Sequence, residues 1–129
     1  MAEKEAVRTE EAPAPFQGAP YSQAIKAGGL LFVSGQVALQ PGSSEPASDA
    51  IGEQTQQVFA NLRAILEAAG SSLDRIVKTT VYLTDLGDFQ AMNDVYKQHV
   101  GDLPPARATI EVSKLPAGAL VEIEAIALA

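Results

Sequence analysis

The C-terminal stretch Val121-Glu122-Ile123-Glu124-Ala125-Ile126-Ala127-Leu128 alternates with a period of two, which predicts a β-strand. Successive side chains of a strand point to opposite faces. The odd-numbered residues therefore form one apolar face, which suits a core. The even-numbered residues form a second face that is half acidic and half apolar. Because a mixed face suits a subunit interface containing a polar cleft, we expect a homo-oligomer.

Upstream of this strand, the first half of the chain predicts a hairpin and a helix. Residues 24–37 form the hairpin, with Gly28-Gly29 as its two-residue turn. Residues 40–50 have loop composition, and apolar residues from Ile51 to Ala69 recur at helical spacing. Ser48 is the predicted N-cap of this helix, and Gly70 is the predicted residue just past its end.

The second half of the chain predicts a strand, a helix and two further strands. Residues 76–83 are rich in β-branched side chains and predict a strand. Residues 87–100 predict a helix, capped by Asp85 or Asp88, with Phe89, Met92, Val95 and Tyr96 on its inner face. Residues 107–112 and 120–128 complete the set. The order predicts an α+β two-layer sandwich, in which a mixed sheet carries both helices on one face.

Length and composition limit the possible functions. The 129 residues make one domain, 1–129, with an extended lead-in over about residues 1–15. The absence of cysteine excludes disulfides, thiolate nucleophiles and zinc fingers. The single histidine, His99, excludes a two-histidine metal site, and we interpret it as structural.

Charge and hydropathy argue against nucleic-acid and membrane partners. The net charge is −7 and no two basic residues are adjacent, whereas nucleic-acid binding needs a basic footprint. The longest apolar run, Leu30 to Val33, is far too short to span a bilayer. The N-terminus lacks the apolar region of a secretory signal and is too acidic for a transit peptide. We therefore expect a soluble, cytoplasmic protein.

Arg107 and Glu122 are the strongest candidates for chemistry. Arg107 follows a rigid Pro-Pro-Ala lead-in and could grip a carboxylate with two parallel hydrogen bonds. By spacing alone, a surface or interface arginine paired with an acid is the commoner case. Glu122, with Glu124 on the same strand face, could orient or deprotonate a water molecule. A solvated sheet face explains the two glutamates equally well.

Three further residues could line a pocket. Tyr21 could supply a ring wall or a hydroxyl donor, although such tyrosines more often pack in a core or interface. Ser34-Gly35 could offer a hydroxyl and a closely approaching backbone, or could mark a bulge. Asn93 could face the edge of a cleft, or could be an ordinary surface residue.

Several segments, taken together, resemble the Rid (reactive intermediate deaminase) family, and its RidA subgroup most closely. The resemblance covers about residues 7–128 and rests on joint order and spacing. The segments are Pro20-Tyr21-Ser22-Gln23-Ala24, Val33-Ser34-Gly35-Gln36, Val77-Lys78-Thr79-Thr80-Val81, Asp88-Phe89 with Asn93 and Tyr96, Pro105-Ala106-Arg107 and Val121-Glu122-Ile123-Glu124-Ala125-Ile126-Ala127.

The resemblance implies a fold and an activity. The implied fold is chorismate-mutase-like, a homotrimer whose sheets form a central barrel with active sites between neighbouring subunits. The implied reaction is hydrolysis of 2-iminobutanoate and 2-iminopropanoate to 2-oxo acids and ammonia. These imines are released by pyridoxal-phosphate-dependent threonine and serine dehydratases. The chain itself is expected to use no cofactor and no metal.

The resemblance also implies residue roles. Arg107 is similar to the family's carboxylate-binding arginine, and Glu122 to the acid that positions the attacking water. Tyr21 and Ser34 resemble pocket residues that contact the substrate, and Asn93 resembles the polar residue at the cleft edge. Thr109 stands where many members have cysteine, and we expect its backbone carbonyl to contact the substrate.

Two departures and three alternatives accompany this hypothesis. Ala19-Pro20-Tyr21 replaces the Gly-Pro-Tyr of many members, and Thr109 replaces their cysteine. The chain could instead prefer a different imine. It could be a ligand-binding or chaperone-like relative that uses the same clefts without turnover. A translation inhibitor or ribonuclease is a further alternative, against which the acidic charge argues.

Overall fold

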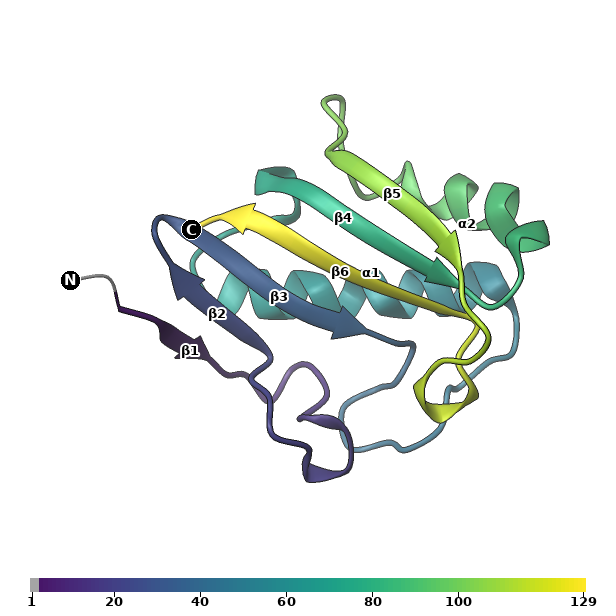
Figure 1. Cartoon of the computed structure of the whole chain (residues 1–129), viewed down its shortest axis with the longest axis horizontal. Coiled ribbons are helices and arrows are strands. Elements are labelled where there is room, and N and C mark those ends of the chain that lie inside the picture. The colour runs from purple at the N-terminus through teal and green to yellow at the C-terminus, as the bar shows by residue number, and fades with distance from the viewer. Residues whose placement is uncertain (1–2) are drawn as a thin grey trace.

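The computed structural model describes residues 3–129, so the first two residues of the predicted lead-in lie outside the described part. Six strands form one sheet, and two α-helices cover one of its faces (Figure 1). The strands are β1 (Glu5–Val7), β2 (Ala24–Ala27), β3 (Leu30–Gln36), β4 (Ile76–Leu83), β5 (Ala106–Glu111) and β6 (Val121–Leu128). The helices are α1 (Ile51–Ala68) and α2 (Phe89–Tyr96).

The sheet is mixed, as predicted. Its strand order is β1-β2-β3-β6-β4-β5, and the β4–β5 pair is parallel whereas the other pairs are antiparallel. The C-terminal strand β6 thus lies in the middle of the sheet, between β3 and β4. The two-layer α+β arrangement confirms the predicted fold class.

The core lies between the sheet and the helices. The odd-numbered residues of β6 from Val121 to Ala127 are buried, which confirms the predicted apolar face. They meet a buried stripe of α1 that includes Val58, Phe59, Leu62, Ile65 and Leu66. The inner face of β6 and the inner face of α1 are both buried. Their burial explains the alternating pattern of the strand and the helical pattern of the helix in the sequence.

The start of α1 corrects one prediction. The N-cap is Ala50, not Ser48, and no side chain caps the helix. The hydroxyl of Ser48 instead accepts a hydrogen bond from the Ala50 N–H at 3.0 Å. This local turn uses the Ser48 hydroxyl before the helix begins. Gly70 follows the helix end with φ +80°, as predicted.

The second helix is shorter than the predicted 87–100. A 3-10 turn, Leu86–Asp88, precedes α2, and the Asp85 carboxylate accepts from the Gly87 N–H at 2.8 Å. After Tyr96 the N–H groups of Gln98 and His99 bond three residues back, so the last turn tightens and the α-helix stops. Phe89, predicted on the inner face, is 40% exposed because it lies at the first position of the helix.

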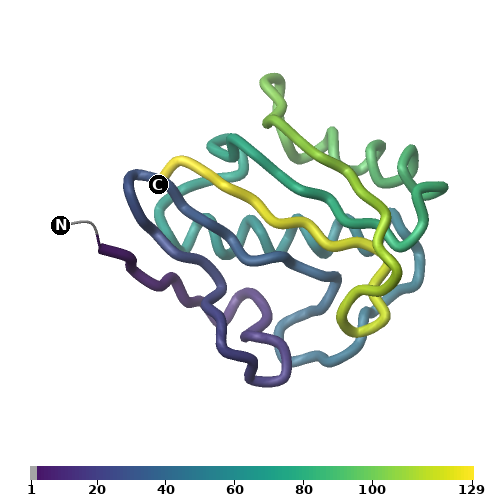
Figure 2. The backbone as a smooth tube through the Cα atoms, in the orientation of Figure 1, coloured from purple at the N-terminus to yellow at the C-terminus, as the bar shows by residue number. Residues whose placement is uncertain are grey.

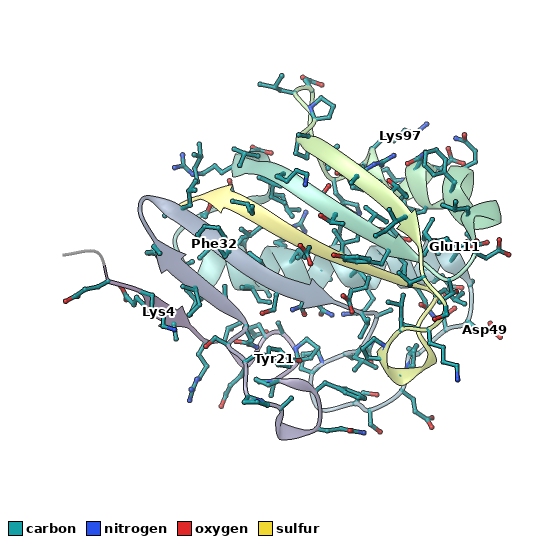
Figure 3. All side chains as sticks on the ribbon, in the orientation of Figure 1. Lys4, Tyr21, Phe32, Asp49, Lys97 and Glu111 are labelled. Atoms are coloured by element: carbon teal, nitrogen blue, oxygen red, sulfur yellow. The ribbon has the colours of Figure 1, made fainter. Side chains whose placement is uncertain are left out.

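The second face of the sheet has no covering layer in the described chain. It carries the even-numbered residues of β6 together with exposed Phe32 of β3 and Ile110 of β5. Figure 3 shows Phe32 on this open face. Figure 2 shows the lead-in folding beside one end of the sheet, next to the loop that follows β3. A cavity lined by both segments confirms that they are neighbours.

Candidate active site

An acidic pocket of about 360 Å³ lies at the end of β3. It brings together three predicted site residues from distant parts of the chain: Tyr21, Ser34 and Glu122. Its other lining residues are Phe16, Ala19, Gly35, Val37 and Pro116. Ala19, the departure noted beside Tyr21, therefore lines the same pocket.

Glu122 fits into this pocket because β3 carries a glycine opposite it. The β3–β6 register shifts between Val33 and Gln36, so Ser34-Gly35 forms an irregularity in the strand, as the bulge interpretation predicted. A Cβ atom on Gly35 would lie 2.5 Å from Glu122 Oε2 and 2.8 Å from its Cδ. A side chain at position 35 would therefore displace the carboxyl group.

The hydroxyls of Ser34 and Tyr21 both bond the backbone, Ser34 as a donor and Tyr21 as an acceptor that keeps its own O–H. Ser34 Oγ donates to the Ser22 carbonyl at 2.6 Å, and the Phe16 N–H donates to Tyr21 Oη at 2.6 Å. The first bond ties β3 to the segment that carries Tyr21, and the second holds the turn at Phe16–Gly18. Both residues shape the pocket, and the exposed ring of Tyr21 forms one of its walls.

The Glu122 carboxyl is the acidic group of this pocket. Burial raises its pKa, and the nearby Glu124 carboxylate raises it further. The Tyr82 hydroxyl donates to Glu124 Oε1 at 3.1 Å, which orients that neighbour. A carboxyl group with a raised pKa in an open pocket gives up and takes back a proton more readily than an ordinary surface glutamate, which suits acid–base chemistry.

A second pocket, the arginine pocket, lies between α2 and β5 and measures about 290 Å³. It contains the predicted residues Arg107 and Asn93. The Arg107 Cζ atom lies 4.7 Å from the centre of the Tyr96 ring and 5.5 Å from that of Phe89. Asn93 Oδ1 is buried and has no hydrogen-bond partner among residues 3–129. The pocket thus offers a cation and an acceptor to a small polar ligand.

The structure separates Arg107 from Glu122. Arg107 pairs in register with Thr79, which faces the helices, whereas Glu122 pairs with Tyr82, which faces away from them. Because side chains alternate along β4, the two groups lie on opposite faces of the sheet. Figure 3 labels Tyr21 of the acidic pocket and Lys97 of the arginine pocket at well-separated places. One chain therefore presents two separate pockets.

Thr109 lies two residues beyond Arg107 on the same strand face and pairs with Val81. Its side chain lines neither pocket. Because the lining of both pockets omits Thr109 altogether, the expected contact between its backbone carbonyl and a substrate stays a prediction. The sequence analysis did not assign a site role to Tyr96 or Thr79. A signal for the pair existed, because a tyrosine predicted on the inner face of a helix needs a polar partner for its hydroxyl, and Thr79 is that partner.

His99 is structural, as predicted. Its ring stacks on Phe59 with centres 4.6 Å apart, and Nε2 lies 2.7 Å from Gln56 Oε1. Burial lowers the pKa of His99, and the positive charge of Arg63 lowers it further. His99 lines neither pocket, so the imidazole is unavailable to the candidate site.

A larger cavity of about 500 Å³ lies between the lead-in and the loop at Pro41-Gly42. Its most buried polar side chain, Gln23, is fully used in holding the lead-in, because its amide bonds Thr9, Ala12 and Pro13.

Nowhere in residues 3–129 do three or more His, Asp or Glu side chains gather closely enough to share a metal ion. Neither described helix has the length and apolar composition needed to cross a membrane.

Comparisons with known proteins match this architecture over nearly the whole chain. The family model described as Endoribonuclease L-PSP matches residues 9–129. A RutC family protein of Pyrococcus horikoshii is 52% identical over 124 residues, covering 96% of this chain and 97% of that protein. The chloroplastic Reactive Intermediate Deaminase A of Arabidopsis thaliana is 45% identical, covering 96% of this chain and 65% of that protein.

A solved structure confirms the fold. The crystal structure of TdcF from E. coli with bound serine has a TM-score of 0.88 and is 36% identical, covering 97% of this chain and 98% of that one. The family match and the high identity to a named deaminase agree with the segments that predicted the family from sequence. The chain therefore belongs to the Rid family of reactive intermediate deaminases, whose family model is described as Endoribonuclease L-PSP.

Proposed function

We propose that this chain is a homotrimeric hydrolase that converts reactive 2-imino acids and their enamine tautomers to 2-oxo acids and ammonia. The substrates are 2-iminobutanoate and 2-iminopropanoate, released by pyridoxal-phosphate-dependent dehydratases. Because such imines are short-lived, the chain acts in the compartment that produces them, which we propose is the cytoplasm. The relative named Reactive Intermediate Deaminase A and the serine-bound relative support an activity on small amino-acid derivatives.

One observation carries this proposal: the predicted site residues fall into two incomplete pockets. We call the two pockets half-sites. The acidic pocket holds a carboxyl group with a raised pKa and no cation. The arginine pocket holds Arg107, and its one carboxylate, Asp94, pairs with Lys97 instead. Within residues 3–129 the salt bridge that forms is Lys97–Asp94, so Arg107 has free donors. A second copy packed on the open face of the sheet would join one pocket to the other.

In the joined cleft, Arg107 binds the carboxylate of the imino acid through two parallel hydrogen bonds. Asn93 Oδ1 accepts a hydrogen bond from a polar group of the substrate, and the Tyr21 ring closes one wall. The negative charge of Glu122 from the neighbouring copy favours the protonated imine and orients a water molecule towards its carbon. The reacting carbon thus lies between the two half-sites.

The reaction balances with Glu122 as proton carrier. The water oxygen forms a bond to the imine carbon, and the C=N electron pair moves to nitrogen. Glu122 takes a proton from the added oxygen and gives it to the nitrogen. The C–N bond then breaks and ammonia leaves with the bonding electron pair. The remaining hydroxyl proton passes to Glu122 and from it to the ammonia, which departs as ammonium, and the carbon keeps its oxygen as the 2-oxo group. The net change is the addition of one water and the loss of one ammonia.

Subunit mixing tests both the reaction and the shared cleft. A dehydratase generates the imine, a trapping amine competes for it, and formation of the 2-oxo acid is followed. Arg107→Ala and Glu122→Gln proteins are each expected to keep only a small residual rate. Unfolded and refolded together in equal amounts, they are expected to regain about one quarter of wild-type activity, because mixed trimers hold one intact cleft each.

Each alternative predicts a different result. Recovery from mixing excludes a site built within one chain, in which every copy would carry a defect. A binding or chaperone-like relative would show no acceleration by the wild-type protein. A ribonuclease would bind RNA in a salt-sensitive way, which the net charge of −7 opposes. Failure of the wild-type protein to accelerate 2-oxo acid formation would contradict the proposal.

A further inference from the structure

The Arg107 side chain is placed by aromatic packing alone. Its Cζ atom lies 4.7 Å from the centre of the Tyr96 ring, with Phe89 at 5.5 Å. Among residues 3–129 these two rings are the partners of the guanidinium, and the salt bridge that forms nearby joins Lys97 to Asp94. A guanidinium over an aromatic ring is attracted to the ring face while its N–H groups stay available. The position of the ring therefore sets the position of the cation.

The Tyr96 ring is itself fixed from two sides. Only 5% of Tyr96 is exposed, and Phe59 packs against it edge to face with centres 5.4 Å apart. Its hydroxyl lies 2.6 Å from Thr79 Oγ1, and Thr79 is fully buried. Because a buried polar group is costly to leave unpaired, this hydrogen bond holds the hydroxyl end of the ring at Thr79.

Thr79 is also the register partner of Arg107 on the adjacent parallel strand. One position of β4 therefore neighbours the backbone of Arg107 and, through the Tyr96 hydroxyl, anchors the ring beneath its side chain. This closed arrangement links β4, α2 and β5 around a single guanidinium. Core packing alone does not require Tyr96 to lie under Arg107, nor Thr79 to lie beside it, at the rim of a pocket.

We infer that Thr79 and Tyr96 are positioning residues that hold the Arg107 guanidinium ready to receive a substrate carboxylate. The inference rests on the proposed function for the identity of that carboxylate. Neither residue touches substrate: Thr79 acts through Tyr96, and Tyr96 acts through Arg107. Preorganisation of this kind lowers the cost of ordering a long side chain when the ligand binds.

Conservative variants separate positioning from stability. Tyr96→Phe keeps the ring and removes its anchor, and Thr79→Val removes the same bond from the other side. Each is expected to raise KM for the imino acid about 3- to 10-fold, the size of one net hydrogen bond, with kcat changed by less than about two-fold. The double variant should show little further rise, because both changes break one interaction.

Thr55→Val is the matched control. Thr55 is equally buried, and its hydroxyl donates within α1 to the Ile51 carbonyl at 2.8 Å, away from both pockets. This variant should lose comparable stability and keep the wild-type KM. Equal KM values for Thr79→Val and Thr55→Val would overturn the inference.

An NMR measurement tests the positioning independently of turnover. The chain has four arginines, so the Arg107 Nε–H signal is easily assigned, and the nearby ring should shift it. We expect this shift to shrink in Tyr96→Phe and Thr79→Val and to stay unchanged in Thr55→Val. An unchanged signal in all three variants would refute the inference. If wild-type protein fails to deaminate imines, the proposed function fails, while this measurement still decides whether the anchor exists.

Discussion

Replacement of Gly35 by alanine should displace the Glu122 carboxyl group and so lower the rate, although Glu122 itself is not mutated. The added Cβ would lie 2.5 Å from Glu122 Oε2, 2.8 Å from Cδ and 3.1 Å from Cγ. Non-bonded carbon contacts are comfortable at about 3.5–4.0 Å. The carboxyl group must therefore move by about 1 Å, and a displacement of that size at a reacting centre costs about 100-fold in rate.

The effect should be on kcat far more than on stability. Glu122 lies on the open face of the sheet, so its side chain can move outward, and we expect the free energy of unfolding to fall by about 1–3 kcal/mol. Gly52→Ala is the matched control. Gly52 lies in the first turn of α1, and its Cβ would meet only Val95 Cγ2 within 4 Å, at an ordinary 3.8 Å.

The dehydratase-coupled assay measures the rate, and a double-mutant cycle tests its cause. On a Glu122→Gln background, Gly35→Ala should lower the residual rate by little, since the group it displaces is already inactive. Wild-type kcat in Gly35→Ala would refute the reasoning. An equal loss on both backgrounds would show that Gly35 acts through something other than the Glu122 carboxyl.

Two further changes test the two half-sites. Glu122→Gln should stabilise the protein at neutral pH. Burial raises the pKa of Glu122 in the fold, so the wild-type protein loses stability as pH rises from the ordinary glutamate pKa to the raised one, and the loss is complete above it. This gain should vanish below the ordinary glutamate pKa of about 4.3, where the group is neutral in both states, and thermal unfolding across pH would show it. An equal gain at every pH would contradict the assignment. Arg107→Lys should raise KM about 10- to 100-fold while charge is kept, because an ammonium cannot form the two parallel bonds of a guanidinium. Steady-state kinetics checks this, and an unchanged KM would mean that charge alone binds the carboxylate.

Much of the architecture follows from local patterns in the sequence. The alternation from Val121 to Leu128 predicted which side of β6 is buried, and the β-branched run from Ile76 to Leu83 predicted β4 with its observed bounds. The Gly28-Gly29 turn predicted the β2–β3 hairpin. These features are readable because each depends on neighbours within a few residues, whose spacing matches the period of the element.

The ends of helices were predicted less well. Serine is a common N-cap residue, but the Ser48 hydroxyl bonds the backbone two residues further on, at Ala50. The helix α2 ends at Tyr96, although the apolar pattern continues beyond it. Caps depend on the backbone path into and out of the helix. The surrounding fold sets that path, and helical periodicity does not record it.

The sequence by itself determined the family, the two-faced last strand and the residue types of the candidate site. Only the tertiary structure decided that β6 lies between β3 and β4, that Glu122 lies against Gly35, and that Arg107 rests on Tyr96. It also decided that Arg107 and Glu122 occupy opposite faces of one chain. The physical reason is that strand order and register join residues far apart in sequence, and a shift of one residue in register would exchange the two faces.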